Sequence, residues 1–184
     1  MAATPPFDRR LTAEEFYAFE DAKGYELVDG WLVPRNGTTT SSMVGLRVGA
    51  VLGTAARHVH GEFFGAGLGI RVNAAEPDTV RRASLSFVSK DRLPHADTPF
   101  LDLVPDFVVE VVSRLASVEH VQSKIDYWLR FGAGVVWVVQ PTSREVYVYR
   151  KGAVPQVFIG DMVISAADVL PGVSAPVSSF FEPA

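Results

Sequence analysis

Apolar positions recur along this chain with two periods, one typical of helices and the other of strands. Thr12–Glu15 reads Thr-Ala-Glu-Glu, the form of a capping box, which predicts the start of a helix. Phe16 and Phe19 then give this helix an apolar side. Residues 25–33 predict a hairpin, because two apolar segments flank Asp29-Gly30, a strong signal for a tight turn.

A second helix and two more strands are expected next. We expect the helix to begin with Ser41 or Ser42 as its cap. Its inner side is formed by apolar residues at helical spacing: Val44, Val48, Val51, Leu52 and Ala55. After the glycine-rich segment 65–69, residues 70–72 and 79–89 predict strands. The glycine cluster enters a strand rather than opening a helix, and no Lys-Ser/Thr follows it, so a nucleotide-binding loop is not expected.

The most apolar part of the chain predicts a strand, a helix and a second strand in succession. Residues 107–112 form an apolar run that is interrupted by one carboxylate, Glu110. A helix is expected over about 117–131, ended by Gly132, because glycine commonly ends helices. Residues 135–139 are apolar throughout and short, which is typical of a strand buried inside a sheet.

The remaining segments indicate one domain. Residues 144–149 and 154–159 predict an antiparallel pair, and a tail rich in Pro, Gly and Ser follows. Because no internal repeat or linker divides the chain, we expect an N-terminal arm at 1–10 and a single domain at 11–184. The order of elements predicts a mixed β-sheet flanked by helices, of the α/β or mixed α+β class.

Composition narrows the class of protein further. A chain of 184 residues, 48% hydrophobic and 21% charged, suits one globular core. It contains no cysteine, which excludes a disulfide framework, a thiolate zinc site and a cysteine nucleophile, and fits the cytoplasmic location that we expect. No apolar run approaches the roughly 18 residues of a membrane span, so no membrane association is expected. The net charge of −4 argues against a generally basic nucleic-acid coat but allows a local phosphate-binding groove.

Glu110 is the first candidate for a functional residue. An ionised carboxylate within an apolar strand is costly to bury unless a metal, a partner or a proton compensates it. Asp106 lies on the same side of the strand, but roughly 13 Å away at about 3.3 Å per residue, which is too far to share one ion. A metal partner for Glu110 would therefore come from a neighbouring element. The alternative is a carboxylate at the end of a sheet, held by an arginine or by backbone donors.

Lys124 and Glu26 are the other candidates. Lys124 lies at the edge of the apolar helix stripe, and helical side chains lean toward the N-terminal end, which here adjoins the Glu110 strand. Its ammonium can therefore reach that carboxylate. The alternative is a lysine whose stem covers the edge of the core while its charge reaches water. Glu26 lies beside aromatic residues in the hairpin, with a solvated strand residue as the alternative. The four histidines form no helical metal pair, so we assign them no role.

Several motifs are more specific together, in order, than any one alone: Tyr25-Glu26-Leu27-Val28-Asp29-Gly30, Val80-Arg81-Arg82-x-x-Leu85-Ser86-Phe87-Val88, Pro105-Asp106-Phe107-Val108-Val109-Glu110-Val111-Val112-Ser113, Lys124-x-x-Tyr127 and Gly134-Val135-Val136-Trp137-Val138-Val139-x-Pro141. From about Leu11 to Phe181, the chain resembles the Uma-two, or "putative restriction endonuclease", family of the PD-(D/E)xK nuclease superfamily. This resemblance implies a restriction-endonuclease-like core that binds a divalent metal, usually Mg²⁺ or else Mn²⁺, and hydrolyses DNA.

Carried over by motif, the resemblance implies that Glu110 and Glu26 bind the metal and that Lys124 helps to activate water. The chain departs from the family at Ser84, which stands where the family has a metal-binding aspartate. Serine is a neutral and weak ligand for magnesium, so the loss of this charge is expected to weaken metal binding by a few kcal/mol. Asp78 or Asp102 could compensate, and the sequence favours neither.

Two hypotheses for function follow, and a third is weaker. The first is a metal-dependent DNA endonuclease that uses Glu26, Glu110 and Lys124. The second is a catalytically inactive nuclease-fold domain that binds nucleic acid or a protein partner. The third is an unrelated domain whose buried carboxylate is simply paired. DNA as the partner rests on the resemblance alone, with phosphate contacts expected from three arginines: Arg81, Arg82 and Arg114. A homodimer is compatible with two sites that face the two strands of a duplex.

Overall fold

The computed structural model describes residues 7–72, 78–95 and 98–182, which form two large β-sheets and one two-stranded sheet. The larger sheet has the order β11-β10-β9-β8-β6-β3, with β3 (Gly61–Gly65), β6 (Leu85–Ser89), β8 (Phe107–Val111), β9 (Val135–Gln140), β10 (Glu145–Tyr149) and β11 (Gln156–Ile159). The smaller has the order β2-β1-β5-β4-β7, with β1 (Tyr25–Val28), β2 (Trp31–Pro34), β4 (Gly69–Arg71), β5 (Val80–Arg81) and β7 (Phe100–Leu101). The expected mixed α and β class is confirmed.

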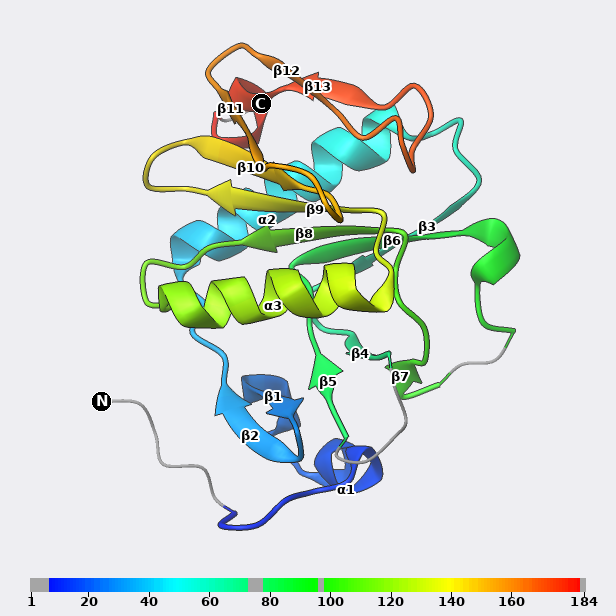
Figure 1. Cartoon of the computed structure of the whole chain (residues 1–184), viewed down its shortest axis with the longest axis vertical. Helices are drawn as coiled ribbons and strands as arrows, with labels where there is room; N and C mark the ends of the chain where they lie inside the picture. Colours follow the sequence, from blue (N-terminus) through cyan, green and yellow to red (C-terminus); the bar gives the residue numbers. More distant parts are fainter. Residues whose placement is uncertain (1–6, 73–77, 96–97, 183–184) are drawn as a thin grey trace.

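Three α-helices accompany these sheets in the described residues: α1 (Ala13–Ala18), α2 (Thr39–Ala55) and α3 (Val118–Phe131). Helices α2 and α3 lie on opposite faces of the larger sheet, and the smaller sheet and α1 lie below it in the view (Figure 1). No helix within the described residues is long and apolar enough to cross a membrane.

The centre of the larger sheet is the pair β8 and β9, which α3 connects along the chain. Strands β8 and β9 are parallel, as expected for two strands joined through a helix, and the other pairs in this sheet are antiparallel. Side chains on these strands alternate between two cores. Val108, Val136 and Val138 pack toward α3 with Ile125, while their neighbours along the strands pack toward α2. Because Glu110 is two residues after Val108, it also faces α3.

Helix α3 has the boundaries that the sequence predicts. Ser117 is the N-cap, and its side chain accepts a hydrogen bond from the backbone N–H of His120. Gly132 ends the helix in a left-handed conformation, with φ of 109°. The buried residues Lys124, Ile125 and Trp128 form one stripe, so the lysine is part of the buried face of the helix.

Helix α2 begins earlier than the sequence prediction, which was wrong about its cap. The N-cap is Thr38, whose side chain accepts from the backbone N–H of Ser41, and the Ser41 side chain accepts from the backbone N–H of Thr38. This reciprocal capping box fixes the helix start at Thr39 and makes Ser41 its third residue. The expected inner stripe is nevertheless correct, because its residues are buried or partly buried in the core: Val44, Val48, Val51, Leu52 and Ala55.

The strand predicted at 79–89 is two strands in different sheets. β5 belongs to the smaller sheet and β6 to the larger one, and residues 82–84 connect them. The break occurs because the backbone N–H groups of this connection bind elsewhere. Arg82 N donates to the Glu26 carboxylate, at 2.9 Å, and Ser84 N donates to Val109 O, at 3.0 Å. The connection therefore contacts Glu26 of β1, in the smaller sheet, and Val109 of β8, in the larger sheet.

The C-terminal tail closes the α2 side of the core. Strands β12 (Val163–Ser165) and β13 (Ser174–Pro176) form an antiparallel pair, and a 3-10 turn, η3 (Val177–Phe180), follows. Two further 3-10 turns are η1 (Ala22–Gly24) and η2 (Lys90–Arg92). The predicted N-terminal arm falls largely outside the described residues. Within its described part, the Phe7 ring packs edge-on against the Phe19 ring, with 5.3 Å between the ring centroids.

Candidate active site

The three predicted site residues come together where the two sheets meet α3. Lys124 Nζ lies 3.0 Å from Glu26 Oε1 and 2.8 Å from Glu110 Oε2, and all three side chains are buried. They come from β1, β8 and α3, which are far apart in the sequence. The β1–β2 hairpin, with Asp29 and Gly30 both at positive φ in its turn, carries Glu26.

Glu26 is surrounded by positive charge and donors. Arg81 Nη1 donates to its Oε2 at 3.1 Å, and both Lys124 Nζ and Arg82 N contact its Oε1. Burial by itself would raise the pKa of Glu26, but the charges of Lys124 and Arg81, with the backbone donor, outweigh it and lower the pKa to about 2. Glu26 is therefore ionised, and the protein itself supplies cationic partners at both of its oxygens.

Glu110 has a different environment. Trp128 Nε1 donates to its Oε1 at 2.7 Å, and Lys124 Nζ contacts its Oε2. Burial in the apolar strand raises the pKa of Glu110; the attraction of Lys124 opposes this and the nearby charge of Glu26 adds to it. The two carboxylates thus share one ammonium but have pKa values shifted in opposite directions.

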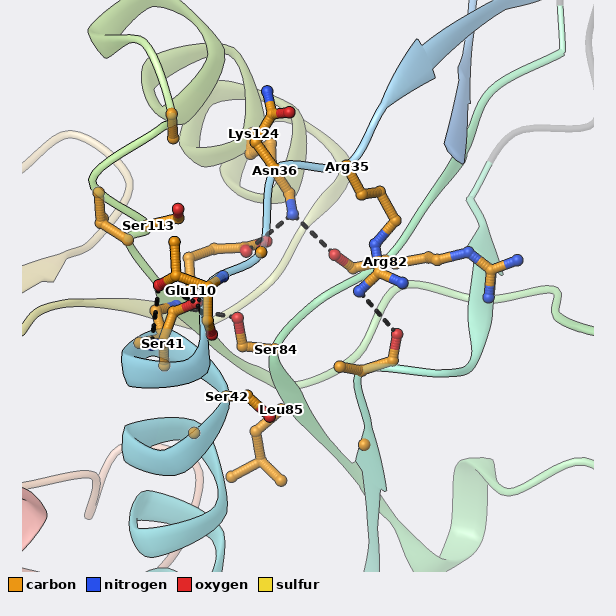
Figure 2. A pocket seen from close by; sticks show the side chains of 18 of the residues that line it. Arg35, Asn36, Ser41, Ser42, Arg82, Ser84, Leu85, Glu110, Ser113 and Lys124 are labelled. Carbon is orange, nitrogen blue, oxygen red and sulfur yellow. Dashed lines mark hydrogen bonds and ion pairs between the residues drawn. The ribbon is translucent and has the colours of Figure 1, made fainter. Parts of the chain in front are cut away.

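Lys124 makes three contacts with oxygen. Besides the two carboxylates, its Nζ donates to the backbone carbonyl of Arg82 at 2.7 Å. Burial alone would lower the pKa of Lys124, but the charges of Glu110 and Glu26 outweigh this effect and raise it. Figure 2 shows Lys124 extending from α3 toward Glu110 on one side and the Arg82 backbone on the other.

Ser84, which by the family resemblance stands at the position of a metal-binding aspartate, lies next to the Glu110 strand. Its Oγ accepts a hydrogen bond from the backbone N–H of Val111 at 2.9 Å, and its own N–H donates to Val109 O. The side chain is half-buried and lines the same cleft as Glu110 (Figure 2). The hydroxyl thus helps to hold the connection between the sheets against β8.

These residues lie in a cleft of about 700 Å³ between the start of α2, β8 and the start of α3. Hydroxyl groups at the start of α2 form one wall: Thr38, Ser41 and Ser42. Lys23 and Arg35 also line the cleft. The Arg35 guanidinium donates to Lys23 O and Ala66 O, at 3.1 and 3.0 Å, so backbone carbonyls hold it in place. The cleft combines two carboxylates with several cationic and hydroxyl groups.

Sequence reasoning missed several residues of the cleft, among them Arg35 and His120, which carry ionisable side chains. Arg35 follows the hairpin in what reads as a loop, and no local pattern distinguishes it from a solvated arginine. His120 lines the cleft from the first turn of α3, and its burial lowers its pKa. One signal could have indicated it, because His120 lies four residues before Lys124 and therefore on the same side of the helix.

The three arginines predicted to contact nucleic acid have different positions. Arg81 is buried, and besides Glu26 it contacts Ser123 Oγ at 3.4 Å and lies over the Tyr127 ring. Arg82 is also buried, and its guanidinium donates to the backbone carbonyls of Tyr25 and Gly67. Arg114 is exposed. Nucleic-acid contact by these arginines stays a prediction.

The side chains, as placed, do not fit a preformed divalent-metal site. No group of three or more His, Asp or Glu side chains suited to an ion exists within residues 7–72, 78–95 and 98–182. All four oxygens of Glu26 and Glu110 already accept from protein donors, and Ser84 adds only a neutral hydroxyl. The two aspartates considered as substitutes bind other groups, Asp78 the backbone N–H of Ala13 and Asp102 the Arg71 side chain.

Comparison with known proteins agrees with the resemblance seen in the sequence. A solved structure from Anabaena variabilis, described as a "putative nuclease belonging to DUF820", has a TM-score of 0.80 to this chain, at 18% identity, and the match covers 93% of this chain and 97% of that one. At this identity the likeness shows a shared fold. The sequence matches no curated protein. The model of the Uma2 family, described as "Putative restriction endonuclease", matches residues 13–178, and the chain therefore belongs to this family.

Proposed function

We propose that this protein acts on the phosphodiester backbone of DNA as an endonuclease whose metal-dependent hydrolysis is impaired. The observation that carries the proposal is the meeting of Glu26, Glu110 and Lys124 in one cleft with a neutral hydroxyl, Ser84, beside them. Membership in a family described as "Putative restriction endonuclease" supports a nuclease-like function. The metal, the activity and the roles of the three residues are parts of the proposal.

The charges of the cleft support nucleic acid as its ligand. Both acids that line it are matched by cations, because Lys124 contacts Glu26 and Glu110 and Arg81 contacts Glu26. Among the described residues, the Arg35 guanidinium hydrogen-bonds to two backbone carbonyls and forms no ion pair, so its positive charge is available to attract an anion. Cationic side chains that neutralise phosphates supply most of the affinity of proteins for nucleic acid.

Impairment follows from the ligands that the chain offers. Magnesium in proteins is usually held by one or two carboxylates together with waters and substrate phosphates. Here each available carboxylate oxygen already has a protein donor, and Ser84 carries no charge. A divalent ion therefore has to compete with Lys124 for these oxygens, without the attraction of a third acid.

A plasmid-cleavage assay tests this proposal. Wild type, Glu110→Ala and Ser84→Asp are each incubated with supercoiled plasmid and Mg²⁺ or Mn²⁺. We expect slow nicking by wild type, none by Glu110→Ala, and cleavage by Ser84→Asp that is faster by roughly ten- to a hundredfold, about 1–3 kcal/mol from one added charge beside a cation. Cleavage by wild type that persists in Glu110→Ala would refute the assigned site.

A second candidate function is DNA binding without cleavage. It is favoured by the ion pairs of Lys124 and Arg81 with Glu26 and Glu110, because these pairs compensate both carboxylates without a metal. In this case wild type gives no nicking with either metal but still binds DNA in EDTA, with an affinity that falls steeply as salt is added. Absence of both nicking and DNA binding would reject nucleic acid as the ligand of this cleft.

A further inference from the structure

Lys124 Nζ occupies the space between the two carboxylates in the way that a bound cation would. Its three oxygen neighbours are Glu26 Oε1 at 3.0 Å, Glu110 Oε2 at 2.8 Å and Arg82 O at 2.7 Å. An ammonium carries three N–H donors, and each of them has an acceptor here. The group is therefore saturated, and it joins an oxygen from each of the two sheets.

The local charge is already balanced by the protein. With Glu26 and Glu110 both ionised, two negative charges face the positive charges of Lys124 and Arg81, which contacts Glu26 Oε2 at 3.1 Å. Adding a divalent ion to this buried cluster would give it an excess of two positive charges. Moving Lys124 aside would not correct this, because a buried ammonium that has lost its partners is itself strongly unfavourable.

We propose that the Lys124 ammonium is the resident cation of this site, and that in the protein without DNA it excludes divalent metals from the space between Glu26 and Glu110. The proposal predicts that removal of the ammonium creates a metal site. Of the ion pairs that the described residues make with these two carboxylates, the one with Arg81 would remain, and a divalent ion would relieve the remaining negative charge. This inference concerns the protein without DNA, whereas the proposed function needs a metal only when substrate phosphates complete its coordination. The two proposals can therefore fail independently.

Manganese binding, measured without any substrate, tests this proposal. Mn²⁺ is titrated into wild type, Lys124→Met, and each of these proteins with Glu110→Gln added. Bound Mn²⁺ is counted by the loss of the electron paramagnetic resonance signal of the free ion, and thermal midpoints are recorded with and without metal. Methionine keeps an unbranched stem of similar length and removes the charge.

We expect Lys124→Met to bind one Mn²⁺ more than its Glu110→Gln counterpart. At a metal concentration about 100 times the dissociation constant, its midpoint should rise by roughly 5–10 °C. Wild type should bind no more Mn²⁺ than wild type with Glu110→Gln. Lys151→Met, in the exposed turn after β10, is the matched control and should behave like wild type.

Two results would overturn the proposal. One is a Glu110-dependent Mn²⁺ ion in wild type, because the ammonium would then not exclude metal. The other is a folded Lys124→Met that binds no additional ion. If Lys124→Met does not fold without metal, refolding on addition of Mn²⁺, followed by circular dichroism, supports the proposal, and failure to refold counts against it. The wild-type comparison requires no variant of Lys124.

Discussion

Replacing Glu26 with glutamine removes one charge from the buried cluster while keeping the shape of the side chain. Glu26 is 2% exposed and accepts from Arg81, Lys124 and Arg82 N, at 2.9–3.1 Å. A glutamine can accept at one oxygen only, and its NH₂ group would face a cationic donor. Arg81 and Lys124 would both lose a counter-charge in a buried position.

Two properties of the buried cluster set the expected loss in stability. A shift in the pKa of Glu26 from 4.5 to about 2 corresponds to about 3 kcal/mol, at about 1.4 kcal/mol for each pKa unit. Breaking one partner of a buried ion pair typically costs about 3–5 kcal/mol. Because Lys124 retains Glu110, the lower end applies. We therefore expect Glu26→Gln to lower the free energy of unfolding at pH 7 by about 3 kcal/mol.

Urea unfolding of wild type and Glu26→Gln at a series of pH values measures this difference. The folded-state pKa of Glu26 lies below its unfolded value, so the charge contributes its full stability above pH 4.5. That contribution is lost as the pH falls through about 2, where the folded carboxylate takes up a proton. The gap between the two proteins should therefore be widest at neutral pH and narrow steadily below pH 4.5.

Two outcomes would contradict this reasoning. One is a variant within about 1 kcal/mol of wild type at pH 7, which would mean that solvent screens the cluster. The other is a gap that stays constant down to low pH, which would mean that the lost stability does not come from the charge of Glu26. The exposed Glu62 on β3 provides the matched control, and Glu62→Gln should change stability by less than about 0.5 kcal/mol.

Two further variants test the surroundings of this cluster. Trp128→Phe removes the donor to Glu110 Oε1 and should lower the free energy of unfolding by at least about 2 kcal/mol. In a double-mutant cycle with Glu110→Gln, the coupling energy should be about 0.5–3 kcal/mol. Strictly additive effects would show that the 2.7 Å contact contributes nothing to stability. Arg35→Ala should weaken DNA binding and reduce the slope of log affinity against log salt by about 1, whereas Arg57→Ala, beyond the far end of α2, should leave both unchanged. Equal effects of the two changes would argue against the cleft as the DNA site.

Local patterns in the sequence determined most of the elements of this fold. The Thr12 capping box, the Asp29-Gly30 turn and the Gly132 helix end all act over a few residues, so their chemistry can be recognised without the rest of the molecule. The same holds for Glu110, because a carboxylate within an apolar strand requires compensation wherever that strand lies.

The tertiary structure decided where the chain breaks and what each charge contacts. Residues 79–89 read as one strand, and they divide only because Arg82 N finds Glu26 and Ser84 N finds Val109 O, both distant in the sequence. The cap of α2 was missed for a local reason, since several hydroxyl residues compete there and reciprocal hydrogen bonds select Thr38.

The sequence by itself therefore determined which residues need an explanation, because the cost of burying Glu110 and the helical position of Lys124 are properties of short segments. Only the tertiary structure decided that Lys124 satisfies both Glu26 and Glu110, and that Arg81 and Arg82 are buried. The physical reason is that charge compensation depends on distances of about 3 Å between side chains from separate elements. No periodicity along the chain determines such distances, which arise when the two sheets and α3 pack together.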